Sequence, residues 1–396
     1  MTDKQIDKHI PRLRFPEFHN DDEWTEKRFG DCLEYEQPQP YLVASDNYKR
    51  TGTPVLTAGK TFVLGYTDEI TGIYNHLPVI IFDDFTTASK FVDFPFKAKS
   101  SAMKMLQNRN GYDLRFMFES IQNHKFEPKD HQRHWINIFS QFKILVPSYS
   151  EQQKIADCLF SIDSYISSIN EKKEQLKAHK KSLMQKLFPQ NGKTVPEYRF
   201  PEFAKDGAWT EKKLGDYLVE HKMKNDGQCE VYSVSVSKGV VNQIDYLGRS
   251  FSASDTSKYK LVKPFDIIYT KSPTGSFPYG IIKQSFIAHN VIVSPLYGVF
   301  SPLNKYIGYI IHSYFESPER TNNYLAPIVK KGAKNTIQIS NDTFLSQTVC
   351  FPSNPKEQRK IAEGLFSISK IIKLYTAKIN YLESQKQGLI QRLFPN

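Results

Sequence analysis

Apolar residues recur at alternating steps of four and three along a segment that follows Pro147. The pattern continues for about five heptads, and Lys173 and Lys180 occupy the two repeat positions that are not apolar. It predicts a long helix with one apolar seam. The seam residues are Ile155, Leu159, Ile162, Ile166, Ile169, Leu176, Leu183 and Leu187.

A second segment repeats this pattern 206 positions later, with Lys386 in the place of Lys180 and Tyr375 in the place of Ile169. Heptads in both copies favour a coiled coil of two helices over a helix that lies on a globular core. The shared lysine either fixes the register of the pair or extends its charged end to solvent. The other residues of this second seam are Ile361, Leu365, Ile368, Ile372, Ile379, Leu382, Leu389 and Leu393.

Two shorter segments of the chain also occur twice. Arg14–Phe18 returns as Arg199–Phe203, 185 positions later. Glu151–Ala156, at the start of the first predicted helix, returns with one change as Glu357–Ala362, 206 positions later. A period of roughly 200 residues is too long for a solenoid repeat. The chain is therefore predicted to hold two copies of one module, each ending in a long helix, whose inserts at about 37–135 and 222–340 have diverged.

The order of these parts predicts a fold of the α+β class. Two mixed α/β domains alternate with two helices, so the second helix returns along the first as an antiparallel coiled coil, and an approximate twofold axis relates the domains. The seam from Ile155 to Leu187 extends about 50 Å at roughly 1.5 Å per residue. Leu393–Asn396 is expected to return to the beginning of the chain. The predicted parts are a first domain at 1–149, a first helix at 150–190, a linker and second domain at 191–350, and a second helix at 351–396.

The composition narrows the choice of partner. The 396 residues carry a formal net charge of +11, which favours a polyanion such as nucleic acid, although a basic protein without such a partner has the same balance. The sequence contains no run of roughly 18 apolar residues, the length that a membrane-spanning helix needs. The four cysteines lack the spacing of a zinc site, and no apolar signal segment begins the chain, so we expect a cytoplasmic protein.

Each insert contains a short apolar strand followed by a polar loop. Val79–Phe82 precedes the loop Asp83–Lys90, and Asp266–Tyr269 precedes the loop Thr270–Phe277. Hydroxyl groups, a lysine and an aromatic side chain on such a loop can contact phosphates and base edges. An ordinary solvated loop has a similar composition, but the duplication and the net charge favour a phosphate-binding role.

Sequence motifs for catalysis are absent. The chain has no Gly-x-Gly-x-x-Gly and no Gly-x-x-x-x-Gly-Lys-[Ser/Thr] segment. It also lacks the Asn-Pro-Pro-Tyr or Asp-Pro-Pro-Tyr segment of amino-methyltransferases that act on DNA. Asp83 and Asp84 either hold a metal or end a strand, and His131 with His134 is too weak a signal for zinc. We expect a chain that is not an enzyme and has no metal of its own.

The repeated motifs resemble those of the specificity (S) subunits of type I restriction–modification systems. The resemblance rests on Arg14–Phe18 with Trp24 and Gly30–Asp31, on their copy at 199–216, and on the two Glu-Gln-x-Lys-Ile-Ala helix openings, and it covers essentially the whole chain. It implies two target recognition domains, each binding one half of a split double-stranded DNA target. It also implies two methylation (M) and two restriction (R) subunits as partners in host defence, which use S-adenosylmethionine, ATP and Mg, while this chain uses no cofactor.

The resemblance does not identify the residues that contact DNA, because the inserts are the variable part of such subunits. Position and chemistry alone select candidates. In the first insert they are Lys60, Tyr66, Thr86, Thr87, Lys90 and Lys99. In the second insert they are Lys238, Arg249, Lys271, Ser272, Thr274, Tyr279, Lys331 and Lys334. If both domains contact the major groove on the same side, the half-sites lie about one helical turn apart, roughly 10 bp.

Two other functions remain open at this point. One is a catalytic modification or restriction chain that carries its own recognition domains, and the missing methyltransferase motifs argue against it. The other is a coiled-coil scaffold that binds protein alone, and the basic charge and the diverged inserts argue against that. Methyl transfer by the purified chain and salt-dependent binding to duplex DNA distinguish the three functions.

Overall fold

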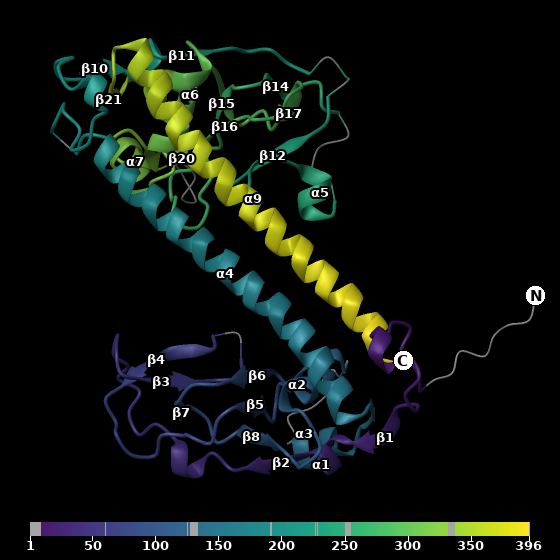
Figure 1. Cartoon of the computed structure of the whole chain (residues 1–396). Coiled ribbons are helices and arrows are strands. Elements are labelled where there is room, and N and C mark those ends of the chain that lie inside the picture. Colours follow the sequence, from purple (N-terminus) through teal and green to yellow (C-terminus); the bar gives the residue numbers. More distant parts are fainter. Residues whose placement is uncertain are drawn as a thin grey trace, which may run out of the picture. The chain divides into compact units, whose positions relative to one another are not determined.

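The computed structural model describes residues 9–59, 61–124, 126, 134–190, 192–225, 227, 229–249, 255–331 and 337–395. They divide into two compact units (Figure 1). Unit 1 comprises the described parts of Met1–Asn170 and Ala377–Asn396, and unit 2 comprises those of Glu171–Thr376. In this part of the chain, no helix is long and apolar enough to cross a membrane.

Two helices of 39 residues each belong partly to one unit and partly to the other (Figure 1). Helix α4 (Tyr149–Leu187) begins in unit 1 and ends in unit 2, whereas α9 (Pro355–Leu393) begins in unit 2 and ends in unit 1. The helices therefore pass between the units in opposite directions. Every seam position from Ile155 to Leu187 and from Ile361 to Leu393 is buried or half-buried, and most positions between them are exposed.

Both long helices contribute to the core of each unit. In unit 1, Ile155 of α4 and Leu393 of α9 belong to one buried cluster with Trp24. In unit 2, Leu187 of α4 and Ile361 of α9 belong to a cluster with Trp209. Full burial of one leucine or isoleucine stabilises the fold by about 1.5–3 kcal/mol, so these apolar ends attach both helices firmly to each unit.

The end of each long helix is also joined to the segment that opens the unit. The backbone N–H of Leu13 donates a hydrogen bond to the carbonyl of Arg392 (2.9 Å), and that of Tyr198 donates to the carbonyl of Lys186 (3.0 Å). The expected return of the chain's last residues to its beginning is thus confirmed in unit 1. The same contact recurs in unit 2 at the corresponding positions.

A four-stranded antiparallel sheet with the same topology lies in each unit. In each unit a helix directly follows, along the chain, the strand that comes second in the sheet order given below. This helix is α2 (Leu114–Asn123) in unit 1 and α6 (Lys305–Tyr314) in unit 2. The strand order in unit 1 is β2 (Leu33–Glu36), β8 (Met103–Asn108), β5 (Val79–Asp83) and β6 (Ser89–Val92). The order in unit 2 is β11 (Leu218–Glu220), β18 (Gly298–Pro302), β15 (Ile267–Tyr269) and β16 (Ile282–Gln284).

A two-stranded antiparallel ribbon closes each unit next to its long helix. In unit 1 it pairs β1 (Thr25–Arg28) with β9 (Lys143–Val146), the strand before α4. In unit 2 it pairs β10 (Thr210–Lys213) with β21 (Thr348–Phe351), the strand before α9. These ribbons and the four-stranded sheets form a frame that the two units share.

The remaining elements differ between the units, as the divergence of the inserts predicts. Unit 1 has a three-stranded sheet of β4 (Val63–Thr67), β3 (Thr53–Leu56) and β7 (Lys97–Ala98), with short helices α1 (Phe29–Cys32) and α3 (His134–Asn137). Unit 2 has three strand pairs: β12 (Tyr232–Ser235) with β13 (Gly239–Asn242), β14 (Lys260–Val262) with β17 (Val291–Val293), and β19 (Lys330–Lys331) with β20 (Ile337–Gln338). Its further helices are α5 (Gln243–Leu247), α7 (Pro318–Leu325) and α8 (Asn341–Ser346).

Candidate nucleic-acid interface

The repeated Arg-Phe-Pro-Glu-Phe segment is tied to the start of a long helix in each unit. Arg14 donates two hydrogen bonds to Glu151, Nε to Oε1 at 2.9 Å and Nη2 to Oε2 at 2.7 Å. Arg199 makes the same pair with Glu357, at 2.7 Å for both bonds. Both carboxylates are buried, and hydrogen bonding with them raises the pKa of each arginine. Bidentate pairs of this kind are strong and directional.

A second ion pair recurs beside the first. Lys154 Nζ lies 2.8 Å from Glu17 Oε1 in unit 1, and Lys360 Nζ lies 3.0 Å from Glu202 Oε1 in unit 2. The charged residues of the repeated motifs are thus used within each unit. Because these motif residues already have structural partners, we expect a nucleic-acid interface in the inserts.

Two of the candidate loops lie at topologically equivalent places. The first joins β5 to β6 and the second joins β15 to β16, the same pair of neighbouring strands in sheets of the same order. Each hairpin holds a non-glycine residue with a positive φ: 55° at Thr87 and 56° at Lys271. Such conformations cost free energy and concentrate at functional sites.

In the β5–β6 hairpin, local hydrogen bonds use the candidate hydroxyl groups. The Oδ1 atom of Asp83 accepts from the Thr86 N–H at 2.8 Å and from the Thr86 hydroxyl at 3.0 Å. The Thr87 hydroxyl donates to the Thr86 carbonyl at 2.7 Å. Lys90 lies nearby on β6 and is half-buried. Both hydroxyl groups thus donate within the hairpin. Thr86 Oγ1 also accepts a weak hydrogen bond of 3.4 Å from the Ala88 N–H, and each hydroxyl oxygen keeps a lone pair that can accept.

The base of this hairpin is held by a buried ion pair. Strand β5 ends at Asp83, and the next residue, Asp84, places Oδ2 3.2 Å from Lys104 Nζ, with both side chains fully buried. The backbone N–H of Trp135 donates to Asp84 Oδ1 at 2.9 Å. Asp84 therefore has a structural role. Among the described residues, no three or more His, Cys, Asp or Glu side chains gather where a metal ion could be held, and His131 lies outside them.

The β15–β16 hairpin brings four candidates together. The hydroxyls of Ser272 and Thr274 donate weakly to backbone carbonyls within the hairpin, at 3.3 and 3.4 Å, and both residues are exposed. The Tyr279 carbonyl accepts a hydrogen bond of 2.7 Å from Tyr269. Lys271 is half-buried, and burial and then the neighbouring charge of Lys260 lower its pKa. This hairpin presents a cation whose charge is not offset by an ion pair with any described residue.

The other candidates of the first insert lie away from the β5–β6 hairpin. Tyr66 is on β4 and half-buried. Lys99, which follows β7, forms an ion pair with Asp46, and this hydrogen bond raises its pKa. Lys99 Nζ also lies 5.8 Å from the centroid of the Tyr48 ring. Its charge is therefore already neutralised within the unit. Lys60 lies outside the described residues.

The remaining candidates of the second insert lie apart from the β15–β16 hairpin. Lys238 is exposed in the β12–β13 turn, with Nζ 4.9 Å from the centroid of the Tyr246 ring. Arg249 is exposed and follows α5. Lys331 is in β19, where it pairs with Ile337, and Lys334 lies outside the described residues. The structure therefore groups Lys271, Ser272, Thr274 and Tyr279 in one hairpin and does not add the others to it.

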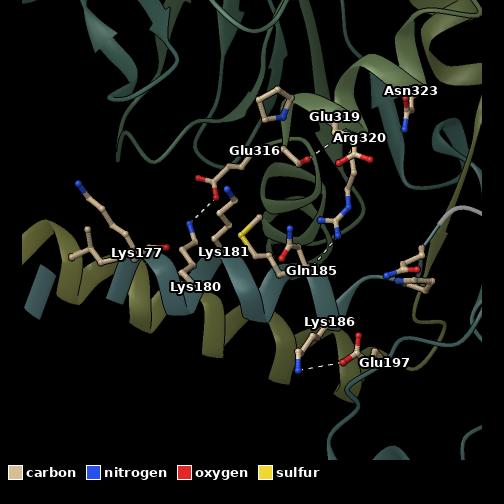
Figure 2. A pocket seen from close by; sticks show the side chains of 17 residues that line it. Lys177, Lys180, Lys181, Gln185, Lys186, Glu197, Glu316, Glu319, Arg320 and Asn323 are labelled. Carbon is tan, nitrogen blue, oxygen red and sulfur yellow. Dashed lines mark hydrogen bonds and ion pairs between the residues drawn. The ribbon is translucent and has the colours of Figure 1, made fainter. Parts of the chain in front are cut away.

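Two seam lysines of the long helices, Lys386 and Lys180, form ion pairs with acidic residues. Lys386 Nζ lies 2.9 Å from Glu119 Oε1 and 2.6 Å from Asp163 Oδ2. Lys180 Nζ lies 2.6 Å from Glu316 Oε2, at the side of an open groove in unit 2 (Figure 2). Lys177, Lys181 and Arg320 also line this groove. The candidate set did not include it.

Known proteins match part of this chain in sequence. Residues 21–178 match the family described as "Type I restriction modification DNA specificity domain". The chain is similar to type I specificity subunits. Over 132 residues it is 51% identical to the type I restriction enzyme EcoR124I/EcoR124II specificity subunit of Escherichia coli. These residues are 32% of this chain and 33% of that protein, so the match spans about a third of the curated relative.

A solved structure shows the same fold over nearly the whole length. The type I restriction–modification system S subunit from M. genitalium matches with a TM-score of 0.65 and 14% identity, over 98% of this chain and 99% of that one. The predicted family resemblance and fold class, mixed α/β units joined by two long helices, are confirmed. The twofold relation between the units and the residues that contact DNA stay predictions.

Proposed function

We propose that this chain is the DNA-binding specificity subunit of a type I restriction–modification complex. Each insert recognises one half of a split, asymmetric DNA target, and the two long helices separate the two halves. The observation that carries this proposal is the pair of equivalent hairpins, β5–β6 and β15–β16, on sheets of identical strand order. A shared frame with unlike hairpin residues supports two binding surfaces of similar placement and different sequence preference.

The proposed partners follow from the family. Two methylation subunits and two restriction subunits assemble on this chain, and they use S-adenosylmethionine, ATP and Mg. This chain contributes DNA contacts and positions those partners, without a catalytic group of its own. The repeated ion pairs Arg14–Glu151 and Arg199–Glu357 support this role, because they give both ends of the scaffold the same local structure.

Methylation mapping tests the proposal. The chain is expressed with its neighbouring methylation subunit in a methylation-free host, and the genome is sequenced by a method sensitive to modified bases. We expect one motif of two short, unlike halves with a fixed gap. Methyl transfer by this chain alone would favour the catalytic alternative, and co-purification without any methylation would favour a scaffold that binds protein alone.

Hairpin variants assign the halves. Thr86→Ala with Thr87→Ala is expected to relax one half of the motif and leave the other intact. Ser272→Ala with Thr274→Ala is expected to do the reverse. The matched control is Lys212→Ala, an exposed residue of the frame strand β10, which should leave both halves unchanged. Relaxation of the same half by both hairpin variants would contradict the assignment of one half to each insert.

A further inference from the structure

Two lysines that the candidate set did not include face each other in the second insert. Lys224 and Lys260 are partners in an isolated antiparallel bridge. The hydrogen bonds of this bridge belong to the neighbouring residues: Asn225 N–H donates to the Tyr259 carbonyl and Leu261 N–H to the Met223 carbonyl, both at 2.9 Å. Lys224 and Lys260 are therefore a non-hydrogen-bonded pair, the arrangement that brings side chains closest on one face. Like charges in this position destabilise a sheet.

Lys271 adds a third positive charge to this pair. It is close enough to Lys260 for that charge to lower its pKa, after the larger effect of burial. The chain holds Lys271 at the start of the β15–β16 hairpin with a φ of 56°. Gly280 packs against its backbone: a Cβ on that glycine would lie 2.8 Å from the Lys271 nitrogen. The hairpin is tight, so the position of Lys271 is well determined.

No described acidic residue neutralises these lysines. Lys260 Nζ donates to the Tyr297 carbonyl at 2.6 Å, and the described residues form no ion pair with Lys224, Lys260 or Lys271. Glu220 is the acid that favours the charged form of Lys271, and its carboxylate already accepts a hydrogen bond of 2.6 Å from Asn341. Lys260 thus has two lysines near it, Lys224 across the bridge and Lys271 from the hairpin, and within the described part of the chain none of the three is held in an ion pair.

Lysines of the first insert, in contrast, have acidic partners. Lys97 Nζ lies 2.6 Å from Glu69 Oε2, and Lys99 and Lys49 form ion pairs with Asp46 and Asp68. Those acids balance the basic residues of the three-stranded sheet. The unbalanced cluster of the second insert is therefore a local feature and does not simply follow from the net charge of the chain.

We propose that Lys224, Lys260 and Lys271 form a binding site for a backbone phosphate of duplex DNA. The inference rests on the proposed function and adds the location of a sequence-independent contact. A phosphate placed among the three ammonium groups offsets their mutual repulsion and forms charge-assisted hydrogen bonds with them. Lys271 lies at the start of the β15–β16 hairpin, so a phosphate bound to it brings the DNA beside the exposed Ser272 and Thr274 hydroxyls.

Salt-dependent DNA binding tests this site. The full chain, purified with its methylation subunit, is titrated with duplex DNA over a range of salt concentrations, with and without the target motif. Lys224→Gln, Lys260→Gln and Lys271→Gln combined are expected to reduce the slope of log K against log salt by about one. Affinity should fall equally for both duplexes, because a phosphate contact carries no sequence information.

Two matched variants serve as controls. Lys224→Arg, Lys260→Arg and Lys271→Arg combined keep the charge and should keep the slope, and Lys212→Gln removes a charge from β10 and should also keep it. The melting temperature of the glutamine variant should not fall, because the substitutions relieve repulsion. If it does fall, Lys224→Gln alone decides the question, since Lys224 is exposed; it must still weaken binding to both duplexes.

The outcomes separate the site from the proposed function. Salt-dependent binding by the wild type with an unchanged slope in the glutamine variant overturns the phosphate site and leaves the proposed function intact. A loss confined to the target duplex also overturns it, because the lysines would then contact bases. Absence of salt-dependent DNA binding by the wild type contradicts the proposed function itself.

Discussion

Lys386 Nζ lies 2.9 Å from Glu119 Oε1, and the side chain of Glu119 is only 1% exposed. The lysine occupies a seam position of α9, and its own side chain is 13% exposed. The alternative that this lysine merely extends to solvent is therefore wrong. Although burial lowers the pKa of Lys386, hydrogen bonds to Asp163 and Glu119 outweigh it and raise the pKa. Lys386 joins α9 to α2 and α4 within unit 1.

Substitution of Lys386 by methionine should destabilise the chain. Lys386→Met leaves Glu119 buried without its partner, and loss of one member of a buried ion pair costs about 3 kcal/mol. Burial raises the pKa of Glu119, and loss of Lys386 removes the charge that opposes this rise, so protonation of the carboxyl at lower pH reduces the cost. We therefore expect a lower melting temperature by calorimetry, with a larger decrease at pH 8 than at pH 5.

A double variant provides the control for this experiment. Glu119→Gln with Lys386→Met removes the stranded charge and should recover part of the lost stability. Equal stability of Lys386→Met and the wild type at both pH values would show that the ion pair does not stabilise unit 1.

The arginines of the repeated motif should behave alike in both units. Arg14→Lys and Arg199→Lys keep the charge but lose the bidentate geometry with Glu151 and Glu357. Each should cost about 2 kcal/mol, the order of a hydrogen bond to a charged group, as measured by denaturant unfolding. Neither should change the methylated motif, because neither residue belongs to an insert. A relaxed motif would show that the frame takes part in recognition.

Periodicity and repetition made the frame predictable from the sequence. The seam from Ile155 to Leu187 fixes the helix and its buried face, since a heptad pattern over such a length fits few other structures. The repeat of Arg14–Phe18 indicated duplication. Its structural reason, the contact of Arg14 with Glu151, joins residues 137 positions apart and could not be inferred from spacing alone.

The candidate interface was less predictable, because charge balance depends on pairing between distant segments. The sequence made Lys99 a candidate for contact with DNA, but in the structure an ion pair with Asp46 neutralises its charge. Lys224 and Lys260 were not among the candidates. In the sequence, however, a lysine stands two positions before each of them, at Lys222 and Lys258, so lysines alternate with other residues. Such an alternation places both lysines of a pair on one face of a strand, and this signal could have found them.

The acidic partner of Lys180 gives a prediction about pH. Burial alone would raise the pKa of Glu316, but His312, Lys180 and Lys283 outweigh it and lower the pKa well below its ordinary range. A lowered carboxyl pKa stabilises the folded state above the pKa of the unfolded chain, about 4.3. That stabilisation is lost as pH falls below this value toward the folded pKa. The wild type should therefore melt higher than Glu316→Gln at pH 7, with the difference shrinking below about pH 4. A difference that stays constant from pH 7 to pH 3 would contradict the lowered pKa.

Replacement of Thr87 by glycine tests DNA recognition with little change in stability, because Thr87 has a positive φ. A β-branched residue in this conformation is strained by roughly 1–2 kcal/mol, whereas glycine is not. Thr87→Gly loses the side chain and a local hydrogen bond, so we expect stability to stay within about 1 kcal/mol of the wild type. Methylation should weaken at one half of the motif. If Thr87→Gly keeps the full motif and wild-type activity, Thr87 does not contact DNA.

The length of the long helices should set the gap between the half-sites. Deletion of 170–176 from α4 and of 376–382 from α9 removes one heptad from each and preserves both seams and the contacts of Lys180 and Lys386. Each helix shortens by about 10 Å, the length of roughly three base pairs of DNA. Methylation mapping should therefore show the original half-sites with a gap about three base pairs shorter. Because three base pairs turn the DNA by roughly 100°, methylation should also be less efficient.

The control replaces the same residues by another heptad of equal length and should keep the original gap. Methylation of the original motif by the shortened chain would show that the helices do not determine the spacing.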